Sequence, residues 1–383
     1  MMEIYLDNSA TTRPYGEVAQ RMMEYLTARY ANPSSAHSKG VEIERDIKNA
    51  RKKIASLMGA IDDEIVFTSG GTESDNIAIR GIAYANRKQG KHIITTCIEH
   101  PAVLSTVKDL ENEGFEATYL GVDSSGVIDF EDFKKALRDD TILVAIMHVN
   151  NESGSVQPVE KIGRYLSKLK RKVYFFVDAV QSFGKIDFRP GRYGIDLMSI
   201  SGHKLHGPKG IGALYIKKGT RLKSIVTGGG QERGVRPGTE NVPGIMGLET
   251  AALKTVSDLP SKIERLGAMK SLLQEEITAR VPNIKINSTP EGACHILNIS
   301  FMDVKGEVLL HTLEQDGVFV STGSACSSKK KGSHVLREMG LSEAQIEGAI
   351  RFSLGEFNDA EQIKCAAEIV SRRVEEFRKI VGK

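Results

Sequence analysis

The sequence has the length of a two- or three-domain protein and the composition of an ordinary globular one. It contains 383 residues, of which 40% are hydrophobic and 26% charged, and its formal net charge is only +3. A charge so close to balance does not favour a nucleic-acid or membrane partner, and no apolar run approaches the roughly 18 residues of a membrane span. Because Met1–Glu3 also carries no basic stretch, we expect a cytoplasmic location.

The N-terminal part predicts an alternation of strands and helices that is typical of α/β proteins. We expect, in order, a short strand at 4–6, a polar segment at 7–14, helices at 17–30 and 40–58, and a strand at 65–68. This strand runs through Ser69-Gly70-Gly71-Thr72 into a helix start at 73–79. Glycines at a helix N-terminus let backbone N–H groups approach an anion, so Gly71 and Thr72 are candidate phosphate ligands. About half of such junctions are plain turns, so the motif alone is weak.

Three further apolar runs, at 92–96, 142–147 and 173–177, each end in polar residues. The first ends near Glu99-His100, the second at His148–Glu152 and the third at Asp178. Because the carboxyl ends of parallel strands share one sheet edge, we expect one crevice there. His100 could stack on a cofactor ring and move protons, and Asn151 could hydrogen-bond to the cofactor or a substrate carboxylate.

The next strand, at 197–200, ends in Ser201-Gly202-His203-Lys204 and places a lysine beside Asp178. An isolated aspartate and lysine would usually be solvated surface residues. Here Gln181, Ser201 and His203 supply further groups for a ring oxygen and a phosphate. A lysine for covalent attachment and a carboxylate for a ring nitrogen are what pyridoxal 5'-phosphate (PLP) requires, so the sequence predicts a PLP site.

The remainder predicts a loop, a hinge and a second unit. A strand at 211–216 is followed by a glycine-rich loop at 228–239 with groups suited to an anion, and then by a largely helical segment at 242–280. Beyond it we expect strands near 295–301 and 318–321 and helices near 307–315 and 359–381. Cys97, Cys294, Cys326 and Cys365 form no Cys-x-x-Cys pair, so we expect neither a metal site nor a disulfide framework.

Seven motifs, spread over nearly the whole chain, together resemble the NifS/IscS-like cysteine desulfurases of the class V aminotransferase family. They are Asp7–Thr12, Thr68–Asn76, Glu99-His100, His148–Glu152, Asp178–Ser182, Ser201–Lys204 and Gly323–Cys326. The resemblance implies a homodimeric PLP enzyme of fold type I, with a mostly parallel sheet sandwiched by helices and a smaller α+β domain. We expect the large domain to span 15–261 and the small domain 262–383, joined by the N-terminal segment 1–14.

The resemblance also implies roles for single residues. Lys204 matches the cofactor-bearing lysine, and His100, Asp178 and Gln181 match the groups that hold the ring. The remaining matches are phosphate ligands at Gly71, Thr72, Ser201 and His203, one more at Thr239 that is supplied by the partner subunit, and substrate-side groups at Asn151 and Arg351. A bidentate arginine fork suits the grip of a substrate carboxylate.

The activity implied by the resemblance is removal of sulfur from L-cysteine, which leaves alanine and a persulfide on Cys326. The sulfur would pass to an acceptor protein, either an iron–sulfur scaffold or a tRNA-thiolation enzyme. The run Lys329–Lys331 departs from similar proteins at the place where acceptors approach. A selenocysteine lyase or another PLP-dependent β-lyase is the alternative, and a cofactor-free sulfur-delivery scaffold is a third reading that Lys204 argues against.

Cys326 differs from the other cysteines in its surroundings. Residues 321–333 are mostly Ser, Gly and Lys, which favours an exposed and mobile loop, and three nearby lysines favour the thiolate. Cys97 and Cys294 adjoin apolar strands and Cys365 lies in an apolar helical run, so we expect these three to be unreactive.

Overall fold

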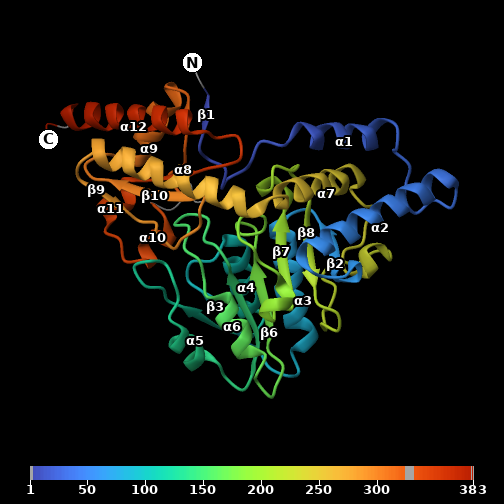
Figure 1. Ribbon diagram of the computed structural model, residues 1–383. Coiled ribbons are helices and arrows are strands. Elements are labelled where there is room, and N and C mark those ends of the chain that lie inside the picture. The colour runs from blue at the N-terminus through green and yellow to red at the C-terminus, as the bar shows by residue number, and fades with distance from the viewer. Residues whose placement is uncertain (1–2, 324–331, 381, 383) are drawn as a thin grey trace.

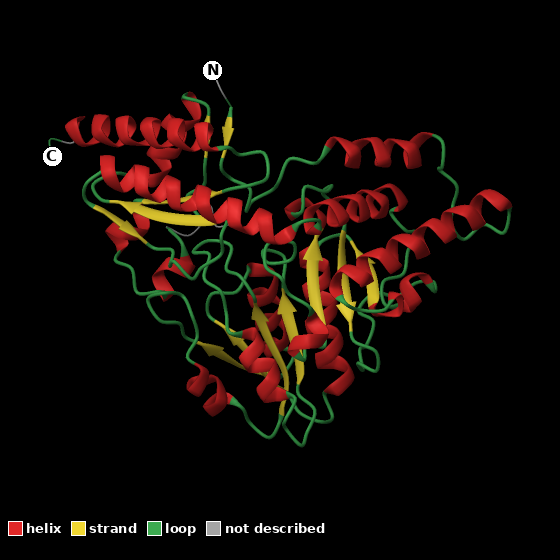
Figure 2. Cartoon of the chain, viewed as in Figure 1, coloured by secondary structure: helices red, strands yellow, loops and turns green. Residues whose placement is uncertain are grey.

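The strands of the protein gather in two groups, and helices surround the larger one (Figure 2). The structure, a computed structural model, describes residues 3–323, 332–380 and 382. The strands are β1 (Ile4–Tyr5), β2 (Ile65–Thr68), β3 (His92–Thr96), β4 (Glu116–Leu120), β5 (Thr141–Met147), β6 (Tyr174–Asp178), β7 (Leu197–Ser201), β8 (Gly212–Ile216), β9 (Ile284–Ile286), β10 (Ile296–Phe301), β11 (Val318–Phe319) and β12 (Ala349–Ser353).

Helices connect most of these strands. They are α1 (Gly16–Thr27), α2 (Ser38–Met58), α3 (Gly71–Asn86), α4 (Pro101–Asn112), α5 (Phe130–Ala136), α6 (Val159–Leu166), α7 (Val242–Val256), α8 (Leu259–Arg280), α9 (Gly306–Gln315), α10 (His334–Glu338), α11 (Glu343–Glu347) and α12 (Ala360–Ile380).

The large sheet has the strand order β2-β8-β7-β6-β5-β3-β4. The five strands from β7 to β4 pair in parallel, whereas β8 pairs antiparallel with both β7 and β2. Successive residues of β6 pack into different cores: Phe175 and Val177 face one, while Tyr174 and Phe176 face the other. Burial on both faces explains why these strands read as continuous apolar runs.

The second group consists of the antiparallel sheet β12-β10-β9 and the parallel pair of β1 with β11. Its core combines Ile4 and Leu6 with residues between Leu266 and Val374. In Figure 1 this group lies with α8, α9 and α12 at the upper left, beside both chain ends. Because β1 belongs here, the chain must then cross from this core to the large sheet.

The mostly parallel α/β fold expected from the sequence is confirmed, with differences of detail. The predicted helical segment 242–280 is two helices separated at Asp258, which has a positive φ of 52°. β4, β9 and β12 were not predicted. β4 lies at a half-exposed sheet edge, β9 has only three residues and β12 contains the polar residues Arg351 and Ser353. Within the described ranges, no helix is both long and apolar enough to cross a membrane.

Candidate active site

A cavity of about 340 Å³ opens at the carboxyl ends of the parallel strands. Ten of the twelve residues predicted for the site line it: Gly71, Thr72, His100, Asn151, Asp178, Gln181, Ser201, His203, Lys204 and Arg351. The other two are Thr239 and Cys326. The sheet register aligns Met147 with Asp178 and Asp178 with Ser199, so neighbouring strands end at one level.

The lysine of the site is held in a short 3-10 turn, Gly202–Lys204, directly after β7. Its Nζ donates hydrogen bonds to the carbonyl oxygens of Ser9 at 2.6 Å and Ala10 at 2.7 Å. Burial lowers the pKa of Lys204 to about 7, and the positive charges of Lys185 and Arg351 act in the same direction. Near neutral pH a large share of this amine is therefore uncharged and nucleophilic.

Asp178 ends β6 as a buried carboxylate whose Oδ1 accepts a hydrogen bond from the N–H of Val180 at 2.9 Å. Burial raises its pKa, while the charges of His100 and Lys204 oppose that rise. A protonated ring nitrogen placed against this carboxylate would supply the positive charge that favours its ionised form.

His100 caps the N-terminus of α4. Its Nδ1 accepts a hydrogen bond from the N–H of Ala102 at 3.1 Å, so the proton of the neutral ring resides on Nε2. Burial lowers the pKa of His100 and keeps the ring neutral near pH 7. A neutral imidazole with one N–H can both donate and receive a proton through Nε2.

Two further carboxyl groups lie near this corner of the cavity. Glu99 accepts hydrogen bonds from Thr96 Oγ1 at 2.8 Å and the N–H of Met147 at 2.9 Å, and burial raises its pKa to about 8. Asp75 lines the cavity, and burial followed by the charge of Asp178 raises its pKa well above the usual range. Burial thus favours the protonated form of both groups, whereas the charges of His100 and Lys204 favour the ionised form of Asp178.

The start of α3 forms a cradle for an anion. Gly70 has a φ of 152°, which an L side chain rarely adopts. A Cβ built at Gly71 would lie 2.8 Å from Val180 Cγ2, so any side chain at Gly71 would have to displace Val180. The unpaired N–H groups at the helix start favour negative charge. Ser201 and His203 face the same cavity, and burial lowers the pKa of His203 to about 4.

Arg351 projects from β12 into the opposite side of the cavity. Its Nη1 donates to the carbonyl oxygen of Asn151 at 2.8 Å, and its Nη2 forms an ion pair with Asp7 at 2.7 Å. Its Nε has no hydrogen-bond partner among the described residues. The guanidinium is thus fixed in place and retains donor capacity for a carboxylate.

The residues present fit PLP. The buried Oε1 of Gln181 has no partner in the described chain, while its Nε2 donates to the carbonyl oxygen of Ser9 at 2.9 Å. The cradle, Asp178, Lys204 and this free oxygen lie around one cavity, and buried polar groups of this kind normally have partners. Several polar groups are therefore available for the phosphate, ring nitrogen, aldehyde carbon and ring hydroxyl of the cofactor.

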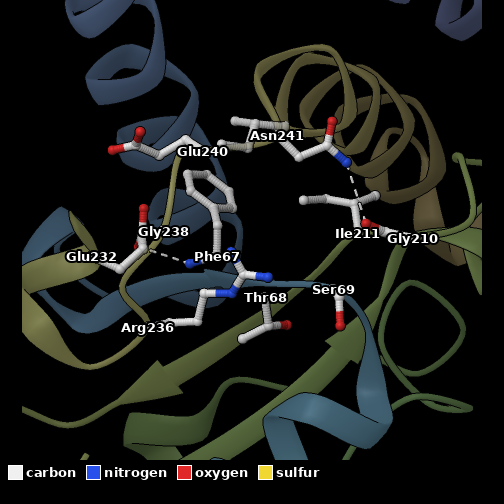
Figure 3. Close-up of a pocket in the computed structure, with 11 residues that line it drawn as sticks. Phe67, Thr68, Ser69, Gly210, Ile211, Glu232, Arg236, Gly238, Glu240 and Asn241 are labelled. Atoms are coloured by element: carbon white, nitrogen blue, oxygen red, sulfur yellow. Dashed lines mark hydrogen bonds between the residues drawn. The ribbon is translucent and has the colours of Figure 1, made fainter. Parts of the chain in front are cut away.

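Thr239 is exposed and is not among the residues that line this cavity. The loop that carries it is anchored near both ends, at Glu232 and at Asn241, which Figure 3 shows. Glu232 accepts from the N–H of Phe67 at 2.8 Å and pairs with Arg51 at 2.6 Å. At the other end, Asn241 donates to the carbonyl oxygen of Gly210 at 3.3 Å. The recess beneath the loop measures about 30 Å³, far too little for a cofactor. The contribution of Thr239 to the site of a partner subunit stays a prediction.

Cys326 lies outside the described residues. Burial raises the pKa of Cys97 to about 12 and also raises that of Cys294, which agrees with the expectation that both are unreactive. Within the described ranges, no group of His, Cys, Asp and Glu side chains is arranged to hold a metal ion.

Sequence reasoning gave no role to Asp7, Ser9 and Ala10. In the structure Asp7 holds Arg351, while the carbonyl oxygens of Ser9 and Ala10 accept from Lys204. The sequence did carry a signal for a functional segment here, because Asp7–Thr12 is polar and follows an apolar strand. Two of the three act through backbone carbonyls, which the sequence does not reveal.

Comparisons with known proteins identify the family of the chain. The family model described as aminotransferase class-V matches residues 4–365. The cysteine desulfurase IscS of Clostridium botulinum is 42% identical over 382 residues, which cover 99% of this chain and 96% of that protein.

Two solved structures are also similar. A NifS-like protein is 38% identical with a TM-score of 0.93, covering 98% of this chain and all of that one. The structure described as SspA in complex with cysteine is 36% identical with a TM-score of 0.81, covering 94% of this chain and all of the other. With its cavity at the ends of parallel strands and these matches over nearly its full length, the chain belongs to the aminotransferase class-V family and, within it, to the cysteine desulfurases.

Proposed function

We propose that this protein uses PLP to remove sulfur from L-cysteine, giving L-alanine and a persulfide on Cys326. The observation that carries the proposal is the single cavity in which Lys204, Asp178, His100 and Arg351 meet. When bound there, PLP withdraws electrons from an attached amino acid and makes its α-proton acidic. The cysteine present in the SspA structure supports the choice of substrate.

The chain's own residues divide the work. Arg351 binds the substrate carboxylate through its guanidinium, which Asp7 and Asn151 already orient. Lys204, with a pKa of about 7, is the base that takes the α-proton. His100 holds or moves the proton of the substrate thiol at Nε2, since its Nδ1 is occupied by a backbone hydrogen bond.

Sulfur transfer requires a nucleophile, and Cys326 is the proposed one. Its thiolate attacks the sulfur of cysteine, so that a sulfur–sulfur bond forms and the carbon–sulfur bond breaks. The electron pair of the broken bond stays on carbon, which takes up a proton to give alanine. The persulfide then passes to an acceptor protein of iron–sulfur assembly or tRNA thiolation.

The substitution Cys326→Ala tests the proposal. We expect the variant to bind PLP and cysteine normally but to lose nearly all alanine formation and all persulfide, measured by amino-acid analysis and mass spectrometry. Cys365→Ala is the matched control and should behave as wild type. Undiminished alanine and sulfide from Cys326→Ala in the presence of a thiol reductant would refute this nucleophile and favour the selenocysteine lyase alternative, whereas pyruvate and sulfide in place of alanine would indicate a PLP-dependent β-lyase.

The proposal includes a homodimer whose sites are shared. Thr239 supports it, because this exposed residue sits on an anchored loop away from its own cavity. A mixture of Lys204→Ala and a Thr239→Trp variant should regain activity in heterodimers that contain one intact site. No recovery in a pair shown to exchange subunits would contradict the sharing.

The division of the chain into domains at 15–261 and 262–383 belongs to the same proposal. The separate core that unites Ile4 and Leu6 with residues from Leu266 onward supports it. Limited proteolysis should then yield fragments that begin or end close to 261.

A further inference from the structure

We propose that Lys185 is a positioning residue for Lys204: its buried ammonium group disfavours a second positive charge nearby and keeps the Lys204 amine free to accept a proton. The inference rests on the proposed function, in which Lys204 is the base. Lys185 lies in the turn after β6, where its N–H donates to the carbonyl oxygen of Ser182 at 3.0 Å.

This turn packs directly against the segment that carries Lys204. Gly184 has a φ of 72°, and a Cβ built there would lie 3.4 Å from Leu205 Cδ2, the residue after Lys204, and 2.7 Å from Thr255 Cγ2. The close approach leaves no room for a side chain at Gly184. Lys185 is therefore held next to the 3-10 turn of Lys204 by the packing of its neighbours.

The side chain of Lys185 is in an unusual environment. It is only 7% exposed, and its Nζ has no hydrogen-bond partner among the described residues. An unpaired buried ammonium group is costly, so its presence calls for an explanation. Burial lowers the pKa of Lys185 to about 8, so the group still carries most of its charge at neutral pH.

Neighbouring groups do not cancel this charge. Lys185 interacts electrostatically with Cys294, whose thiol burial keeps protonated, and with His295, which is fully buried and has both ring nitrogens unpartnered in the described chain. Its charge also acts on His203 and His206. The positive charge of Lys185 therefore acts on several residues of the segment that carries Lys204.

The charges that act on Lys204 can be compared directly. Lys185 and Arg351 favour the neutral amine, whereas Asp7 and Asp178 favour the ammonium form. His100 and His203 also face Lys204, and burial keeps both neutral. Arg351 is paired with Asp7, so much of its effect is offset. Lys185, whose Nζ has no hydrogen-bond partner among the described residues, exerts the largest of these charge effects on Lys204.

A second buried lysine supplies the matched control. Lys270 is also 7% exposed, but its Nζ donates to the carbonyl oxygens of Ala293 at 3.1 Å and Thr289 at 3.3 Å. It shares Cys294 and His295 with Lys185 but is not one of the main charges that act on Lys204.

The experiment is a pH titration of the PLP-loaded protein, followed by the visible absorbance that changes when the Lys204 nitrogen loses its proton. For Lys185→Met we expect the midpoint to rise by about one pH unit, while Lys185→Arg and Lys270→Met keep the wild-type midpoint. Competitive acetylation of the cofactor-free proteins, read by mass spectrometry at Lys204, should shift in the same direction.

The outcomes separate the two proposals. A wild-type protein that forms no adduct at Lys204 would overturn the proposed function. An adduct with an unshifted midpoint in Lys185→Met, or an equal shift in Lys270→Met, would overturn the role of Lys185 alone. If Lys185→Met does not fold, Lys185→Gln removes the same charge and keeps a polar end, and the same outcomes decide.

Discussion

The two sides of the cavity are built in different ways. The large-sheet wall, formed by Gly71, Thr72, His100, Asp178 and Ser201–Lys204, consists of strand ends and helix starts that one sheet aligns. The opposite wall includes Arg351 on β12 and Ser9 and Ala10 of the N-terminal segment. The hydrogen bonds from Arg351 to Asp7 and from Ser9 to Ser353 each join residues 344 positions apart. One side of the cavity is thus built by neighbouring strands of a single sheet, and the other by contacts between segments that are far apart in the sequence.

This difference indicates a division of labour. The groups that fit the cofactor lie mainly on the large-sheet wall, where a buried sheet holds them rigidly. The group that fits the substrate carboxylate depends on contacts between distant segments. Damage to the first wall should therefore abolish cofactor attachment, whereas damage to the second should weaken substrate binding and leave the cofactor in place.

The largest effect is expected for Lys204→Ala on the large-sheet wall. Loss of the base and the attachment point should lower kcat by at least about 10²- to 10⁴-fold and abolish the borohydride-fixed PLP adduct, seen by peptide mapping. Lys209→Ala, an exposed lysine five residues on, is the control and should keep both. An adduct that persists on another lysine would refute the assignment.

Arg351→Met addresses the opposite wall. Loss of a charge-assisted hydrogen bond of about 1.5 to 3 kcal/mol should raise KM for cysteine roughly 10- to 150-fold, while the absorbance of bound PLP stays unchanged. Arg351→Lys keeps the charge but not the forked guanidinium, so its KM for cysteine should fall between those of the wild type and Arg351→Met. If Arg351→Met also loses PLP, the opposite wall contributes to cofactor binding and the proposed division between the two walls is wrong.

A smaller effect is expected for Asp7→Asn. The guanidinium of Arg351 would lose one of its two anchors, so KM for cysteine should rise about fivefold, consistent with about 1 kcal/mol for one hydrogen bond. Asp109→Asn, which removes a surface partner of Arg80, is the control and should leave KM unaltered. A lower KM in Asp7→Asn would show that Asp7 competes with the substrate for Arg351.

The last prediction concerns the pH dependence of stability, which does not involve activity. The pKa of Lys204 is about 7 in the folded protein and 10.5 as its ordinary value. Between these values the unfolded chain binds a proton that the folded protein lacks, so stability contributed by this group rises with pH across the window. In cofactor-free protein, Lys204→Met should flatten that rise, measured by urea unfolding at several pH values. An identical slope in both proteins would show that burial does not lower the pKa of the Lys204 amine.

Sequence reasoning succeeded best on the large-sheet wall. Runs such as Val173–Val177 end in Asp178 because parallel strands are buried on both faces, and their polar ends must then meet at one edge. Arg351 was found only through resemblance, since β12 has no apolar run of its own. The contacts of Lys204 with Ser9 and Ala10 involve backbone carbonyls, for which side-chain identity carries no signal. Cys326 and the domain boundary stay predictions.

The N-terminal segment has a consequence for the order in which the protein matures on the ribosome. β1 pairs with β11, and the N–H of Ser9 donates to Ser353 Oγ at 2.8 Å, so the first residues made find their partners only near the end of translation. At about 5 to 20 residues per second, this delay lasts roughly 15 to 70 seconds. The large sheet can form during that time, but the lysine that it presents gains its carbonyl contacts only after β12 is released. A nascent chain therefore presents the cofactor-binding wall alone, and the substrate-binding wall is added only when the polypeptide is complete.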